Sequence, residues 1–127
     1  MAQRATGVSR TLPCILSSAR TARRFVADRC AGWGVVSDQL HTLQLLTSEV
    51  VANAVIHGRS EIRLALSATD KTIRVEVGDD NSRHPSRQPQ DLEALDGRGL
   101  AIVDRLADSW GVEERPLGKV VWFELRR

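Results

Sequence analysis

The chain has 127 residues, which is the size of one domain and too short for two of ordinary size. Its hydrophobic fraction of 42% and charged fraction of 27% are typical of globular domains and argue against a disordered chain or a membrane protein. The formal net charge of +2 comes without a stripe of basic residues interleaved with aromatic ones, so nucleic acid is not the predicted partner.

The start of the chain carries no targeting signal that the sequence reveals. Residues 1–10 are small, polar and basic, and they lack the apolar segment of a secretion signal. We expect them to form a flexible leader before a single domain over residues 11–127. No apolar run reaches the roughly 18 residues of a membrane span, which favours a cytoplasmic protein without membrane contact. Cys14 and Cys30 show neither a CxxC unit nor a histidine cluster, which favours two reduced structural thiols.

Two amphipathic helices are predicted after the leader. Residues 18–31 repeat apolar side chains at intervals of three and four, which is one stripe of a helix. Ser37 can cap a second helix, whose apolar stripe continues until Gly58. The second helix has the longer stripe and is the strongest helical pattern in the chain.

A hairpin and a long polar segment come next. Residues 62–66 and 73–77 alternate apolar and other side chains, and the turn-prone residues 68–71 join them. This pattern predicts two antiparallel strands with one buried face. Between Asp79 and Gly97 almost nothing can be buried. Such a long segment inside a small domain is usually functional, and we interpret it as a lid.

A third helix is predicted after this segment, with Leu100 and Leu106 on its apolar side and its end near Trp110 and Gly111. A last strand follows over residues 120–125. The order is helix, helix, strand, strand, lid, helix, strand. It predicts the α+β class, a two-layer α/β sandwich whose helices pack on one face of a mostly antiparallel sheet.

Two polar residues on the second helix are candidates for chemistry. Glu49 and Asn53 are four residues apart, so they lie about 40° apart around the helix axis and share one face. Their row runs beside the apolar stripe, at the edge of the core, where a carboxylate and an amide can reach a ligand. Taken alone, the pair also fits an ordinary solvated helix face, which is the commoner case.

Two further segments can bind parts of a nucleotide. Asp79 directly follows a strand, where its carboxylate can accept a hydrogen bond from the amine of adenine or simply belong to a turn. The run Gly97-Arg98-Gly99-Leu100 opens the third helix, and it fits a phosphate cradle or a hinge between loop and helix. Because no third glycine follows, a nicotinamide cofactor is disfavoured.

Together and in order, these segments resemble the GHKL ATPase superfamily. Residues 49–58 resemble its N box, Asp79 its first glycine box, residues 97–100 its second glycine box and residues 118–123 its terminal strand motif. Within the superfamily, the chain resembles the compact bacterial anti-sigma-factor serine/threonine kinases over about residues 15–125. The resemblance implies the Bergerat fold with an ATP lid.

The resemblance also implies a site for ATP and Mg²⁺. Asn53 would coordinate Mg²⁺, and Glu49 would be the catalytic base that takes the proton from an incoming hydroxyl. Asp79 would bind adenine, and His57 would line the nucleotide pocket or only pack beside it. The remaining nucleotide-binding positions would be Asn81, Gly97, Arg98, Gly99 and Leu100.

The implied function is ATP-dependent phosphorylation of a serine or threonine on an anti-anti-sigma (STAS-type) protein. The same domain would alternatively sequester a sigma factor, and family members of this sort are commonly homodimers. One departure stands out, because Asn81 and Arg83 occupy positions where the first glycine box has glycines. The alternative is therefore a catalytically weak or inactive ATP-binding or adaptor module that acts only by binding a regulatory protein.

Overall fold

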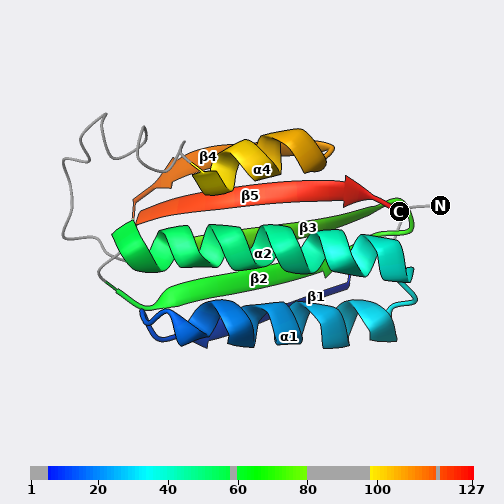
Figure 1. The fold of residues 1–127 in the computed structure, drawn as a ribbon, viewed down its shortest axis with the longest axis horizontal. Coiled ribbons are helices and arrows are strands. Elements are labelled where there is room, and N and C mark those ends of the chain that lie inside the picture. Colours follow the sequence, from blue (N-terminus) through cyan, green and yellow to red (C-terminus); the bar gives the residue numbers. More distant parts are fainter. Residues whose placement is uncertain (1–5, 58–59, 80–97, 117) are drawn as a thin grey trace.

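The computed structural model describes residues 6–57, 60–79, 98–116 and 118–127. The elements follow the order β1 (Thr6–Leu12), α1 (Ser17–Gly32), α2 (Ser37–His57), β2 (Ile62–Ala68), β3 (Thr72–Asp79), α4 (Arg98–Leu106), β4 (Ser109–Arg115) and β5 (Gly118–Arg126). In Figure 1 these helices lie together on one face of the sheet. The α+β two-layer sandwich predicted from the sequence is confirmed.

The described strands form one antiparallel sheet with the order β1-β2-β3-β5-β4. The predicted hairpin is present, with Leu64 of β2 opposite Val77 of β3 and both side chains buried. Its turn is closed by the Thr69 N–H, which donates to the carbonyl of Thr72 at 2.9 Å. The register between β3 and β5 places Val77 opposite Val121, so the buried face continues across the sheet.

The core lies between the sheet and α2, which also packs against α1 and α4. The buried stripe of α2 includes Leu43, Leu46 and Val50, as its periodicity predicts. Both helices predicted in the first half of the chain are therefore present, each within one residue of its expected start. Among the described residues, no helix has the length and apolar character to cross a bilayer.

Both cysteines are free thiols in structural surroundings. Cys30 lies on the buried side of α1, and this burial raises its pKa to about 11 despite the opposing charge of Arg127. Cys14 is half-buried, and its thiol donates to the carbonyl of Val55 on α2 at 3.5 Å. A buried thiol with a raised pKa is a poor nucleophile, so Cys30 serves packing.

Residues 6–10 form most of strand β1, where the sequence analysis expects a flexible leader over residues 1–10. The strand pairs with β2 along its whole length, and Leu12 lies opposite Ile62. The sequence gives little sign of it because β1 lies at the edge of the sheet and buries only Leu12. An edge strand this exposed shows no apolar alternation.

A second strand that the sequence analysis does not predict, β4, forms the other edge. The third helix was expected to end near Trp110 and Gly111, but α4 ends at Leu106. Trp110 instead lies opposite Phe123 of β5, and its indole N–H donates to the Asp104 carboxylate at 2.8 Å. A short segment with few apolar residues fits the end of a helix and a strand equally well.

The sheet face away from the helices carries a network of ion pairs. Arg74 donates to Glu76 at 2.8 Å and to Glu124 at 3.0 Å, and Arg115 donates to Glu113 at 2.8 Å. Partial burial alone would lower the pKa of Arg74, but the hydrogen bonds that it donates to Glu76 and Glu124, together with their negative charges, outweigh this effect and raise that pKa. The charges on this face are therefore largely neutralised within the fold.

Candidate functional site

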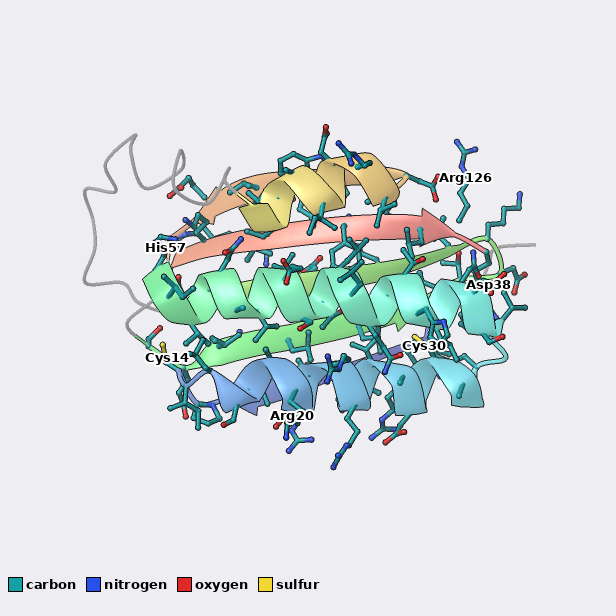
Figure 2. All side chains as sticks on the ribbon, in the orientation of Figure 1. Cys14, Arg20, Cys30, Asp38, His57 and Arg126 are labelled. Carbon is teal, nitrogen blue, oxygen red and sulfur yellow. The ribbon has the colours of Figure 1, made fainter. Side chains whose placement is uncertain are left out.

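A cavity lies where the end of α2 meets the ends of β3 and β5 and the start of α4. Figure 2 labels His57 at this end of α2 and Asp38 at the opposite end. The walls consist of Val50, Asn53, Ala54, His57, Val77, Gly78, Asp79, Leu100, Lys119 and Val121. The structure thus brings four of the sequence-predicted site residues, Asn53, His57, Asp79 and Leu100, around one space.

The polar part of the α2 wall consists of Asn53 and His57. Asn53 and His57 are one helical turn apart, so both reach the same side of the helix. The amide nitrogen Nδ2 of Asn53 is buried and has no hydrogen-bond partner in the described part of the chain. Burial of an unsatisfied amide costs free energy, so this group is suited to a ligand that enters the cavity.

Glu49 does not belong to the cavity wall, although the sequence analysis places it with Asn53. It is half-buried on α2, one turn before Asn53. Val50, the next residue, belongs to the wall, so Glu49 is left out by its direction around the helix axis and not by its position along the axis. Glu49 therefore lies beside the cavity.

Asp79 ends β3 and lies on the wall, and Gly118 of β5 explains how it fits there. A methyl group built at Gly118 would overlap both the backbone carbonyl and the carboxylate of Asp79. Any larger residue would push the acid away, so glycine is required for this close approach. In the sequence, this close approach is indicated only by Gly118 at the start of the terminal strand motif.

Lys119 is a wall residue that sequence reasoning missed. It is only 6% exposed, although lysine is rarely buried. The register pairs Gly78 with Val120, so one further step places Lys119 beside Asp79. Opposite charges on neighbouring strands attract each other. The available signal was alternation, because Lys119 takes the same inward side of β5 as the buried Val121.

Comparison with protein families identifies this arrangement. Residues 12–125 match the family described as "Histidine kinase-like ATPase domain". The chain belongs to this family. The match covers nearly the whole chain, and it confirms the resemblance that the ordered motifs indicate.

The histidine kinase-like ATPase fold is supported by a solved structure as well. The crystal structure of the RsbU and RsbW domains of Rv1364c from Mycobacterium tuberculosis matches with a TM-score of 0.74 and 22% sequence identity. The match covers 95% of this chain and 32% of that one, so this chain spans about a third of that structure. At such identity the likeness shows the fold alone. No curated protein matches the chain.

In this histidine kinase-like ATPase domain, α4 begins at the second predicted glycine box. Arg98 and Gly99 lie in its first turn, and the side chain of Leu100 is buried against the cavity. Asn81 and Gly97 lie outside the described residues, as does the segment between them that was predicted to be the lid. Of the segment predicted to contact the phosphates, the structure therefore describes only the start of α4, residues 98–100.

The cavity is narrow as it stands. Its volume is about 20 Å³, which is room for about one water molecule. A purine base is several times larger than one water molecule, so a nucleotide needs more room than these walls enclose. The walls formed by Leu100 and Lys119 belong to different elements, α4 and β5, which makes a relative shift of these side chains the simplest way to open it.

Proposed function

We propose that this domain is an ATP-dependent protein serine/threonine kinase of the cytoplasm, which phosphorylates an anti-anti-sigma (STAS-type) protein and sequesters a sigma factor. The observation that carries the proposal is the meeting of Asn53, His57, Asp79 and Leu100 around one cavity. Membership of a family described as an ATPase domain and the fold shared with an RsbW-containing protein support it.

The residues around the cavity fit ATP with Mg²⁺. Mg²⁺ prefers oxygen ligands and is usually held by one or two protein groups together with phosphates and water. The Asn53 side chain can supply such an oxygen, and its buried nitrogen, which has no partner in the described residues, can donate a hydrogen bond to a phosphate oxygen. Asp79 can accept a hydrogen bond from the adenine amine, while Val77 and Val121 offer apolar walls for the base.

Phosphoryl transfer relies mainly on positioning and charge neutralisation, and bound Mg-ATP would supply the phosphoryl group. Glu49 lies one turn from Asn53 on the same rigid helix, beside the cavity. Its carboxylate would accept the proton of the serine or threonine hydroxyl as that oxygen bonds to the terminal phosphorus of ATP, while the bond from this phosphorus to the bridging oxygen breaks and ADP leaves. The proposal thus gives Asn53 a binding role and Glu49 a role in proton transfer only.

Two variants separate these roles. Calorimetry with Mg-ATP should show binding to the wild type, and Asp79→Asn should weaken it by about tenfold or more, because a charged hydrogen bond is lost. Glu49→Ala should abolish transfer of radiolabelled phosphate to a STAS-domain protein while ATP affinity changes by less than about twofold. The matched control is Glu61→Ala, since Glu61 is exposed and does not line the cavity. Undetectable binding at millimolar Mg-ATP would rule out the kinase.

The second candidate function is the adaptor module that acts only by holding a regulatory partner. The narrow cavity of about 20 Å³ favours it, together with Asn81 and Arg83 in the place of box glycines. In that case, capture of a sigma factor or STAS-domain protein should persist without nucleotide and should be unaffected by Asn53→Ala. Loss of capture in nucleotide-free protein would exclude this alternative.

A further inference from the structure

A larger hollow lies away from the nucleotide cavity, between α1 and the edge strand β1. Its volume is about 390 Å³, and its walls are formed by Arg10, Arg20, Thr21, Arg24, Phe25, Asp28 and Arg29. We call it the arginine groove. Four arginines and one aspartate give these walls a charge of +3, which exceeds the +2 of the whole chain. Figure 2 labels Arg20 on the outer side of α1.

The positive charge of the groove is not neutralised by the fold. Within the described ranges, the ion pairs all involve other arginines. Arg10 and Arg29 instead lie over the ring of Phe25, with guanidinium carbons 5.9 and 5.5 Å from its centroid. Such contacts hold the arginines in place without removing their charge. The groove is therefore arranged for an anionic partner.

The neighbouring backbone shows what shape that partner has. β1 is the terminal strand of the sheet and pairs with β2 alone among the described strands. Its other edge presents backbone N–H and C=O groups that can pair with an added strand. The sequence of β1 contains no proline, and its only charged residue is Arg10, so little protects the edge.

The spacing of the arginines matches an extended chain. Arg24 lies about 6 Å beyond Arg20 along the helix axis and about 40° from it around the axis, so the two share one side of α1. Side chains on one face of a strand repeat about every 6.6 Å. Two acidic residues at alternate positions of a strand added beside β1 would thus match the spacing of Arg20 and Arg24.

We propose that the arginine groove and the free edge of β1 together bind an extended acidic segment of a partner protein, with carboxylates at alternate positions. A second copy of this chain is a poor fit, because pairing β1 with itself would bring Arg10 and the α1 arginines of both copies together. Nucleic acid would use the charge but not the strand edge.

Fluorescence anisotropy with labelled peptides tests the proposal. The probe is a peptide of about eight residues that alternates glutamate with threonine, which is enough to follow β1. A peptide of identical composition with its glutamates in one block should bind about fivefold more weakly or worse. Two further versions carry N-methyl groups on alternate residues, each set blocking one edge. One of them should lose binding and the other should keep it, because only one edge pairs with β1.

Protein variants locate the binding. The double substitution Arg20→Gln with Arg24→Gln should lower the affinity for the alternating peptide by about tenfold, because two charge pairs are lost. Arg23→Gln is the matched control, since Arg23 is exposed on the same helix but does not line the groove, and it should change affinity by less than about twofold. Asn53→Ala should leave peptide binding intact, so a failed nucleotide site is distinguishable from a failed groove.

Two results would overturn the proposal. The first is equal affinity for the alternating and the block peptides, which would indicate charge attraction without a strand. The second is tighter binding of an oligothymidylate than of the alternating peptide, which would assign the groove to nucleic acid. In either case both N-methylated peptides would bind alike.

Discussion

Arginines occupy two regions of this molecule in opposite ways. On the uncovered face of the sheet, Arg74 contacts Glu76 and Glu124 at distances of 3.0 Å or less. In the arginine groove, no guanidinium group has a carboxylate within ion-pair distance among residues 6–57, 60–79, 98–116 and 118–127. The same residue type therefore belongs to the fold in one region and stays available for binding in the other.

The difference comes from what each backbone places opposite the arginine. The β3–β5 register sets Arg74 directly across from Glu124, which is a favourable cross-strand pair. On α1, the neighbours of Arg20 at three and four residues are Arg23 and Arg24, and like charges at these spacings repel. A cluster of four arginines with only one acid, Asp28, costs the free protein stability and is better explained by a partner than by folding.

Replacing Arg74 is expected to have the largest effect on stability. Its guanidinium lies over the Trp122 ring at 4.2 Å from the centroid and joins two glutamates. Arg74→Met removes these contacts and leaves the two negatively charged glutamates without the positive charge between them. The free energy of unfolding should therefore fall by about 2 kcal/mol. Urea denaturation measures this. A loss below about 0.5 kcal/mol, the ordinary range for a surface change, would show that the network is not structural.

The Trp122 ring, over which Arg74 lies, can be displaced by a substitution at its cross-strand neighbour Gly111. A methyl group at Gly111 would lie 2.9 to 3.0 Å from three atoms of the Trp122 ring. Gly111→Ala should therefore displace the ring and destabilise the protein by about 1 to 2 kcal/mol, with an altered tryptophan emission spectrum. Gly32→Ala is the matched control, because a methyl group there meets nothing within 4 Å. Unchanged emission in Gly111→Ala would mean that the ring does not need this glycine.

The elements that the sequence reveals are those that bury a repeating pattern. The stripe of α2 and the alternation of the central hairpin predict α2, β2 and β3, because most of these positions face the core. The edge strands β1 and β4 escape prediction because β1 is largely exposed, β4 is only partly buried, and neither shows clear alternation. The arginine groove escapes for the same reason, since it needs Arg10 to lie in a strand beside α1.

The candidate site could be predicted as a set of motif positions but not as a shape. Asn53 and Asp79 are found from the order of the motifs, and the fold brings both to the cavity wall. Lys119 is missed because a lysine in a strand is normally solvated. Glu49 falls outside the wall although the next residue, Val50, belongs to it. Periodicity shows which residues share a face of α2, whereas the face that borders a cavity is decided by packing.

The smallest expected change in stability is that of Arg20→Gln. It is the most informative for comparing the groove with Arg74, because it is a gain and the other changes are losses. Arg20→Gln removes repulsion from Arg23 and Arg24 and a positive charge near the N-terminus of α1. The free protein should gain about 0.2 to 0.5 kcal/mol of stability at low salt, since glutamine and arginine favour helix equally well. Thermal unfolding at about 0.05 M and about 0.5 M NaCl measures the gain, which should shrink as salt screens the charges. A loss of more than about 1 kcal/mol would mean that Arg20 stabilises the fold, as Arg74 does, and that the groove is not reserved for a partner.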